Sequence, residues 1–304
     1  MAQTDTYGTQ ITNIMYEDLI DVVTNIDPID TYVLSNTPNA RAGQRYHEWT
    51  LDNLISTQTA GTAEGATFTA TSVTGAARTG NYCQITRQQW ALTDTLLATE
   101  TVGGDQEAYQ MQRHMKSLSR DIEYALLINS GSPASASSAS ARVSAGMRAW
   151  ITDNKVTAAT GSTSAALGET VMNNALQECW ADGGKPSVAL LGGYQKRAFS
   201  GLGTQTRERG LAGSVAEVQF AVDIYKSDFG PIMLKLHHHM QDYADSEIVI
   251  LGDMSLWATA WLRPITSYEI ARTGGARNFM VEAEYTLESR AEKGSAKITN
   301  LTSS

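Results

Sequence analysis

The most restrictive feature of the sequence is a long segment, residues 56–80, that cannot form a hydrophobic core. It consists almost entirely of Thr, Ala, Gly and Ser, and its main other features are Glu64, Phe68 and Arg78. A segment of this composition buries too little apolar surface to offset the conformational entropy that is lost on ordering. Loops of this length inside compact domains are normally functional or disordered. We therefore expect a long finger that reaches for a neighbouring molecule.

The residues on both sides of the finger have the character of β-strands. Residues 46–54 alternate in part, with Trp49 and Leu51 on one side, and residues 82–92 are rich in aromatic and β-branched side chains. Both patterns are typical of strands. We predict that the two runs are the arms of one β-hairpin, which makes residues 46–92 an extended loop.

The clearest helical signal follows this hairpin. Asp105 and Glu107 suit the positive end of a helix dipole, and residues 129–131 mark an end. Apolar side chains recur between them at steps of three and four, at Ala108, Met111, Met115, Leu118, Ile122 and Ala125. The spacing predicts one helix over about residues 104–129, with this stripe packed into the core.

From about residue 167 the pattern becomes mixed α/β. We predict helices over residues 167–179 and 194–199, and strands over residues 188–191, 215–225, 232–240 and 247–251. The loop over residues 201–213 contains Arg207 and Arg209. Because a guanidinium group meets a carboxylate with two hydrogen bonds, these arginines could pair across a subunit contact. A solvated loop explains them equally well.

The strongest strand signal lies near the end of the chain, over residues 279–288. Apolar side chains alternate there with a face that includes Glu282 and Glu284. We predict a long strand whose hairpin partner is residues 265–271. We expect its acidic face to be solvated or to meet basic residues of another subunit.

The first residues of the chain form an arm that cannot bury its own apolar face. Residues 11–23 have apolar side chains near helical spacing, which indicates a short amphipathic helix. Pro28 then breaks the pattern, because the residue before a proline is pushed away from helical geometry. We predict a brief extended piece over residues 31–34.

Composition limits the classes of function. The net charge is −9 and no cluster of Lys and Arg is present, so the chain lacks the basic patch of a nucleic-acid-binding protein. Charged residues make up 18%, which suggests that much polar surface lies against other protein. We find no signal peptide and no apolar run long enough for a membrane span. Cys83 and Cys179 have no metal-type spacing, and we interpret both as small buried apolar residues.

Three consecutive histidines are the only cluster that suggests an enzyme. Neighbouring side chains of a strand point to opposite faces, so only His237 and His239 could share a metal, with Asp242 or Asp245 completing the site. We prefer a polar strand at a subunit contact. The sequence has no P-loop and no nucleophile elbow, and we therefore expect no enzyme, metal site or cofactor.

The order of these parts resembles the major capsid proteins of tailed bacteriophages, which have the HK-ninety-seven-type fold. Several short runs strengthen the resemblance, at residues 27–35, 81–85, 107–110, 119–127, 141–142, 146–147, 150–151, 261–264, 271–274 and 281–287. The resemblance extends from about residue 20 to the C-terminus. No single run is a chemical signature, and the specificity lies in the ordered set.

The resemblance implies a mixed α/β (α+β) fold with four parts. These are an N-terminal arm (1–45), an extended loop (46–92), a peripheral domain with a spine helix (93–166 and 256–304) and an axial domain (167–255). Glu64, Phe68, Arg78, Arg207 and Arg209 are the residues that we expect at contacts between subunits. The finger would lie over a neighbouring subunit and the arm would reach across capsomer edges.

The implied function is that of a structural subunit. Pentamers and hexamers would form an icosahedral head that encloses double-stranded DNA, assembled in the bacterial cytoplasm and found in the virion. Expected partners are a separate scaffolding protein, a portal and decoration proteins, with no membrane. Residues 56–80 contain no Lys, so the Lys–Asn cross-link of some relatives is not expected at its usual place. The alternatives are an encapsulin shell and, with less support, a tail or decoration protein.

Overall fold

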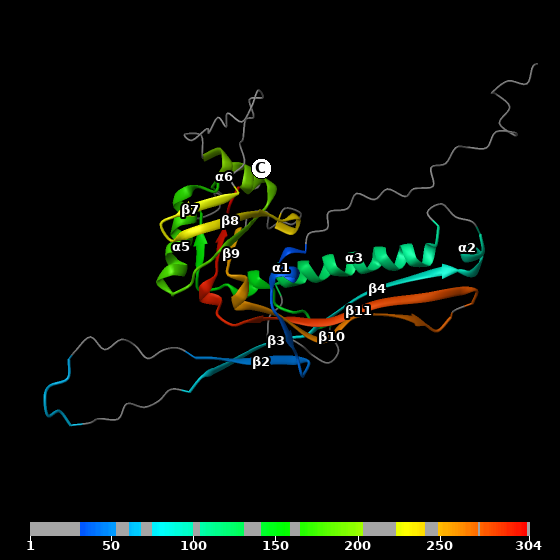
Figure 1. Ribbon diagram of the computed structural model, residues 1–304, viewed down its shortest axis with the longest axis horizontal. Coiled ribbons are helices and arrows are strands. Elements are labelled where there is room, and N and C mark those ends of the chain that lie inside the picture. Colours follow the sequence, from blue (N-terminus) through cyan, green and yellow to red (C-terminus); the bar gives the residue numbers. More distant parts are fainter. Residues whose placement is uncertain are drawn as a thin grey trace, which may run out of the picture.

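The computed structural model describes residues 31–52, 61–67, 75–99, 104–130, 141–158, 165–202, 223–240, 249–272 and 274–302. In this part of the chain the strands form sheets of four, six and two strands, and one long helix runs beside the four-stranded sheet (Figure 1). The predicted mixture of helices and strands is therefore confirmed. The described residues include no helix with the length and apolar character that a membrane span requires.

The long sheet has the strand order β1-β10-β11-β4. Its strands are β1 (Asn39–Arg41), β10 (Trp257–Ile270), β11 (Ala276–Ser289) and β4 (Gln84–Thr93). β11 pairs antiparallel with both β10 and β4, and β1 pairs parallel with β10. The strand predicted at residues 279–288 and its hairpin partner at 265–271 are both confirmed, and both extend further than the alternation indicated.

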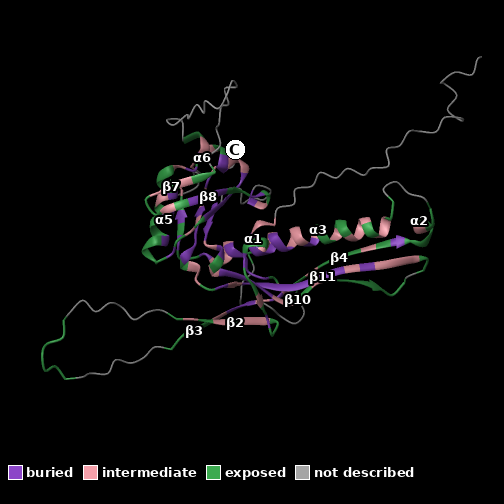
Figure 2. Ribbon diagram, in the orientation of Figure 1, coloured by how far each residue is buried: buried purple, intermediate pink, exposed green. Residues whose placement is uncertain are grey.

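The spine helix is α3 (Gln106–Leu127), which agrees with the prediction to within two residues at each end. The Asp105 carboxylate accepts the backbone N–H groups of Glu107 and Ala108, which caps the helix. Its C-terminal half buries Leu118 and Ile122 in the core that it shares with β11. The N-terminal half is more exposed (Figure 2), and Met115 is an exposed side chain. The predicted apolar stripe is thus fully buried only in its second half, while Met111 of the first half packs partly buried against the same core.

The six-stranded sheet has the order β5-β12-β9-β6-β8-β7. The strands are β5 (Lys155–Thr157), β12 (Ala296–Thr299), β9 (Val249–Gly252), β6 (Val188–Leu191), β8 (Gly230–Leu236) and β7 (Ile224–Ser227). One face packs against α5 (Glu169–Ala181) and α6 (Gly193–Leu202). On the other face, Val188, Leu190 and Ile250 join the core under the spine helix. Two sheets therefore share one central core.

Short elements connect these layers. They are α2 (Asp94–Ala98), α4 (Met147–Trp150) and three 3₁₀ turns, η1 (His238–Met240), η2 (Met254–Leu256) and η3 (Glu292–Gly294). The predicted helix at residues 11–23, the loop at 201–213 and the first part of the predicted strand at 215–225 lie outside the described residues.

The predicted extended piece at residues 31–34 is wrong. The chain forms a short helix there, α1 (Tyr32–Asn36), although its N-cap residue Thr31 makes no side-chain capping bond. The cap comes from the spine helix instead, because the Glu123 carboxylate accepts the N–H groups of Val33 at 2.6 Å and Leu34 at 2.7 Å. A partner so distant in sequence gives no local signal.

The predicted pairing within the finger hairpin is also wrong. β2 (Tyr46–Leu51) pairs with β3 (Ala77–Tyr82), whereas β4 leaves the finger and joins β11. β4 gains burial there, since Trp90 packs against the main core and Gln88 donates a hydrogen bond to Asp121 of the spine helix. β5 and β12, whose residues fall in the predicted peripheral domain (93–166 and 256–304), lie in the six-stranded sheet, and the division into four parts stays a prediction.

Candidate assembly surfaces

A buried polar junction joins three parts of the subunit. The Glu123 carboxylate of the spine helix caps α1 and also lies 2.9 Å from Nε2 of His237, which follows β8. Both side chains are fully buried. A buried carboxylate is costly unless it is paired and hydrogen-bonded, and here three partners satisfy it. The junction therefore fixes the spine helix against α1 and against the end of the six-stranded sheet.

We had predicted that the histidine cluster lies on a polar strand at the surface, and this prediction is wrong. β8 ends at Leu236, and the next residues turn into η1, which places the His237 ring inside the subunit against Glu123. His239 lies edge-on to the Tyr124 ring, with 5.6 Å between the ring centroids, and burial lowers the pKa of His239. No group of three metal-binding side chains occurs among the described residues, which exclude Asp242 and Asp245.

The finger is anchored at its root by Asn81, a residue that the sequence analysis did not single out. Its side-chain amide is fully buried at the end of β3. Nδ2 donates to the carbonyl oxygens of Ala145 and Leu287 at 3.0 Å each, and Oδ1 accepts the N–H of Ala145 at 3.0 Å. The neighbouring Gly80 has no room for a side chain, since a Cβ there would lie 2.6 Å from the carbonyl oxygen of His47.

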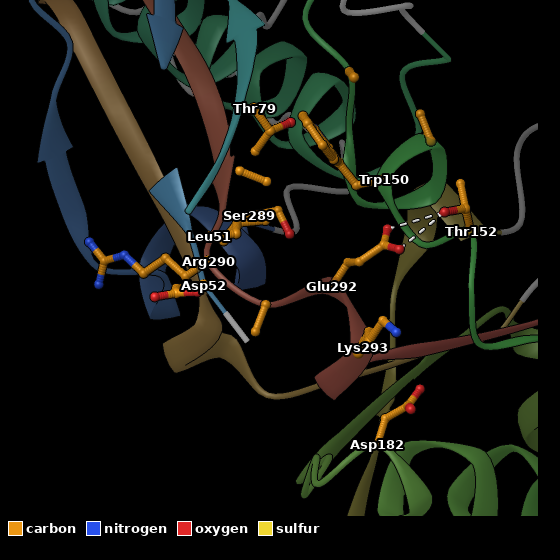
Figure 3. A pocket seen from close by; sticks show the side chains of 14 residues that line it. Leu51, Asp52, Thr79, Trp150, Thr152, Asp182, Ser289, Arg290, Glu292 and Lys293 are labelled. Atoms are coloured by element: carbon orange, nitrogen blue, oxygen red, sulfur yellow. Dashed lines mark hydrogen bonds between the residues drawn. The ribbon is translucent and has the colours of Figure 1, made fainter. Parts of the chain in front are cut away.

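A pocket of about 650 Å³ lies beside this root (Figure 3). Its lining comes from the base of the finger, from α4 and the residues after it, and from residues 289–293. The ring of Trp150 packs against Trp49 of β2, with 5.4 Å between the centroids. Glu292 accepts a hydrogen bond from the Thr152 hydroxyl at 3.1 Å, and burial raises the pKa of its carboxyl group. The finger thus joins the body through a mixed apolar and polar seam.

The residues that we expected at subunit contacts do not gather in one place. Glu64 lies in the exposed turn over residues 61–67, where Gly65 has a φ of 79°. Arg78 is also exposed, and it forms an ion pair with Glu48 on the adjacent strand of the same chain. The remaining three, Phe68, Arg207 and Arg209, lie outside the described residues. The role of all five in contacts between subunits stays a prediction.

The acidic face of β11 is not solvated, which corrects our expectation. Glu282 and Glu284 are both buried, and Arg263 of β10 pairs with the two carboxylates. Arg142 adds a second cation 2.7 Å from Glu284, and Arg87 lies 3.4 Å from Glu282. The basic partners come from the same chain and lie far away in sequence, so the alternation alone could not reveal them.

The two cysteines are buried and free, as the sequence analysis predicted. Burial raises the pKa of the Cys83 thiol to about 11 and that of Cys179 to about 12. Thiols of this kind are poor nucleophiles at neutral pH, because the reactive thiolate is scarcely populated.

A long hairpin beside a spine helix, a second sheet and a projecting finger define the subunit of a protein shell. The chain matches the family model of the SU10 major capsid protein over residues 3–302. It therefore belongs to the SU10 major capsid protein family, and it is a structural capsid protein, as the resemblance implied. No curated protein matches the sequence.

Solved structures agree with this fold at low sequence identity. The cyanophage A-1(L) capsid asymmetric unit has a TM-score of 0.69 at 12% identity, and the match covers 96% of this chain and 98% of that chain. The mature capsid of bacteriophage PhiM1 has a TM-score of 0.62 at 11% identity, and the match covers 94% of this chain and 92% of that chain. The holo-SrpI encapsulin complex from Synechococcus elongatus has a TM-score of 0.60 at 9% identity, and the match covers 100% of this chain and 98% of that chain. These likenesses establish the HK-ninety-seven-type fold.

Proposed function

We propose that this protein assembles with copies of itself into the pentamers and hexamers of an icosahedral phage head that encloses double-stranded DNA. The observation that carries the proposal is the finger, within a chain of the major capsid family. All seven described residues of its tip, 61–67, are exposed, and the tip contributes nothing to either large core. A tip whose described residues add nothing to the cores of their own subunit gains a role when it contacts another subunit.

A closed shell also explains how weak contacts suffice. An exposed ion pair of the kind that Glu64 or Arg78 can form contributes only about 0 to 1 kcal/mol. A shell repeats each contact around every capsomer, and multivalent contacts reinforce one another. The net charge of −9 suits a container whose wall does not bind DNA tightly. A separate scaffolding protein and a portal are the further partners that we propose, and the protein has no catalytic role.

A finger deletion tests this function. Residues 53–75 are replaced with a short Gly/Ser turn, which retains β2 and β3, whereas a deletion of residues 57–78 would remove Ala77 and Arg78 of β3. We expect a folded, soluble subunit that no longer closes into shells, as shown by circular dichroism, sedimentation and negative-stain microscopy. The matched control, Arg272→Gln, removes only exposed ion pairs outside the finger, with Asp94 and Glu269, and should still assemble.

Two results would contradict the proposal. If the wild-type protein, expressed with any scaffold that it needs, forms only monomers, dimers or trimers, it is not a shell subunit. If the deletion variant forms normal heads, the finger has no assembly role.

The likeness to the holo-SrpI encapsulin complex supports one alternative, an encapsulin. This alternative is distinguished by the content of purified particles, since a phage head holds DNA and an encapsulin holds protein cargo.

A further inference from the structure

One end of the six-stranded sheet has an apolar face that the described residues leave uncovered. Val188, Met233 and Ile224 lie side by side across β6, β8 and β7. Val188 belongs to the main core and is 7% exposed, but Met233 is 46% exposed and Ile224 is 56% exposed. The core therefore stops between β6 and β8, while the apolar row continues to the sheet edge. We call the exposed part, Met233 with Ile224, the edge strip.

Two lysines flank the edge strip on the same sheet face. Lys226 lies two residues after Ile224, and Lys235 lies two residues after Met233, so alternation along each strand places them on this face. Both residues are exposed. The face thus presents an apolar centre with positive charge on its borders, which fits an amphipathic segment that carries acidic side chains.

We propose that the edge strip is the docking site of residues 11–23 of the same chain. Wound as a helix, this segment places five apolar side chains, Ile11, Met15, Leu19, Val22 and Val23, within an arc of about 120°, while Ile14 and Ile20 lie outside this arc. Its charged residues, Glu17, Asp18 and Asp21, lie together within the adjoining arc of about 100°. The segment has no Lys or Arg, so its charge is opposite to that of the two lysines that flank the edge strip.

The tether between segment and strip is short. The Lys235 ammonium lies 5.4 Å from the centre of the Tyr32 ring. Tyr32 begins α1, which lies at the start of the described chain (Figure 1). From there, residues 24–31 can span up to about 26 Å when extended. That reach exceeds the distance of two strand residues, about 7 Å, that separates Lys235 from Met233. A tethered segment also has a high effective concentration at its site.

The other nearby candidate fits less well. Residues 203–222 lead directly into β7, but they carry Arg207 and Arg209 against Glu208 and Glu217, which leaves no net charge. The two lysines that flank the edge strip, Lys226 and Lys235, therefore favour the acidic N-terminal segment. This inference does not depend on shell formation, since it concerns one subunit.

Disulfide trapping in the full chain tests the proposal. The native cysteines are buried, so they do not compete for a mild oxidant. The variant Leu19→Cys with Met233→Cys should form an intramolecular disulfide about tenfold faster than the control pair, Leu19→Cys with Met115→Cys. Met115 is 40% exposed and lies on the spine helix, so it matches Met233 in residue type and in exposure.

Charge reversal provides a second measurement. Replacing Lys226 and Lys235 with Glu should lower the hydrogen-exchange protection of residues 11–23, and adding Glu17→Lys, Asp18→Lys and Asp21→Lys should restore it. Equal trapping rates at Met233 and Met115 would overturn the proposal. Disulfide-linked dimers would instead assign the strip to the arm of a second copy. Faster trapping from Leu211→Cys than from Leu19→Cys would assign it to residues 203–222.

Discussion

Nε2 of His237 lies 2.9 Å from a carboxylate oxygen of Glu123, and neither side chain has exposed surface. The same carboxylate accepts the N–H groups of Val33 and Leu34, so one side chain holds the spine helix, α1 and the end of β8 together. Each of these bonds is buried, so water cannot replace it at no cost when one part separates from the others. The integrity of this junction should therefore be required for a stable subunit.

Replacing Glu123 with Ala should destabilise the subunit by about 3 to 5 kcal/mol, because it leaves a buried histidine and two amide groups without their acceptor. Glu123→Gln should cost less, since its amide oxygen can still accept a hydrogen bond. Urea unfolding measures both. The control Glu107→Ala removes a partly exposed ion pair on the same helix and should cost about 1 kcal/mol or less. Equal losses for Glu123→Ala and Glu107→Ala would contradict this account.

Burial lowers the pKa of His239, and this predicts how stability depends on pH. The folded state binds this proton less tightly than the unfolded state, so the unfolded chain carries more protons at mildly acidic pH. The contribution of His239 to the free energy of unfolding should be complete above the ordinary histidine pKa of about 6.5. It should decrease as the pH drops from there to the pKa of His239 in the folded state. His239→Gln should flatten this part of the curve of unfolding free energy against pH. An unchanged slope in the variant would show that His239 does not cause it.

The elements that the sequence predicted well obey local rules. The spine helix combines an apolar period with an acidic N-cap at Asp105, and in β11 apolar side chains alternate with polar ones over residues 281–288. The fully buried strand at residues 188–191 was predicted with its observed bounds, because an apolar run of this length, followed by two glycines, is too short for a buried helix. In these elements the side-chain pattern and the backbone structure depend on the same few neighbouring residues.

The parts that could not be predicted depend on distant partners. α1 is helical because Glu123, 90 residues away, supplies its cap. β4 looks like a continuation of the finger, yet it pairs with β11, nearly two hundred residues further along the chain. Asn81 gave no signal, since one asparagine in a strand resembles any other until its partners are known. For the candidate assembly surfaces, local pattern therefore located the finger but not its anchor.

Asn81 should be the most sensitive polar position of the finger root. Asn81→Ala leaves the buried carbonyl oxygen of Leu287 and the N–H of Ala145 without this partner, at about 1 to 3 kcal/mol for each group. We expect a total loss of roughly 3 kcal/mol, measured by urea unfolding. Asn278→Ala is the control, because its side chain donates to the Ala271 carbonyl at an exposed site. Stability close to the wild type in Asn81→Ala would show that the anchor is dispensable.

Arg263 should hold the long hairpin together electrostatically. The register of β10 against β11 shifts on both sides of this residue, and such an irregularity re-aims a side chain. From there Arg263 contacts two buried carboxylates, Glu282 and Glu284. A hydrogen bond from Tyr268, with the charges of Arg263 and Arg87, lowers the pKa of Glu282. Without Arg263, two neighbouring carboxylates lose their shared cation.

Arg263→Met should therefore lower the unfolding free energy by about 1 to 2 kcal/mol at pH 7. This effect is small for a pair of buried carboxylates, because the guanidinium group is half exposed and solvent screens its charge. A depressed carboxyl pKa stabilises the fold above its ordinary value of about 4.5, and this contribution is lost as the pH falls through the folded-state pKa. The difference between wild type and variant should consequently shrink below pH 4.5. Arg87→Met is the matched control, since Arg87 reaches only Glu282, at 3.4 Å, and is similarly exposed. Equal effects of the two substitutions, or a difference that persists in acid, would show that Arg263 stabilises the hairpin by packing rather than by charge.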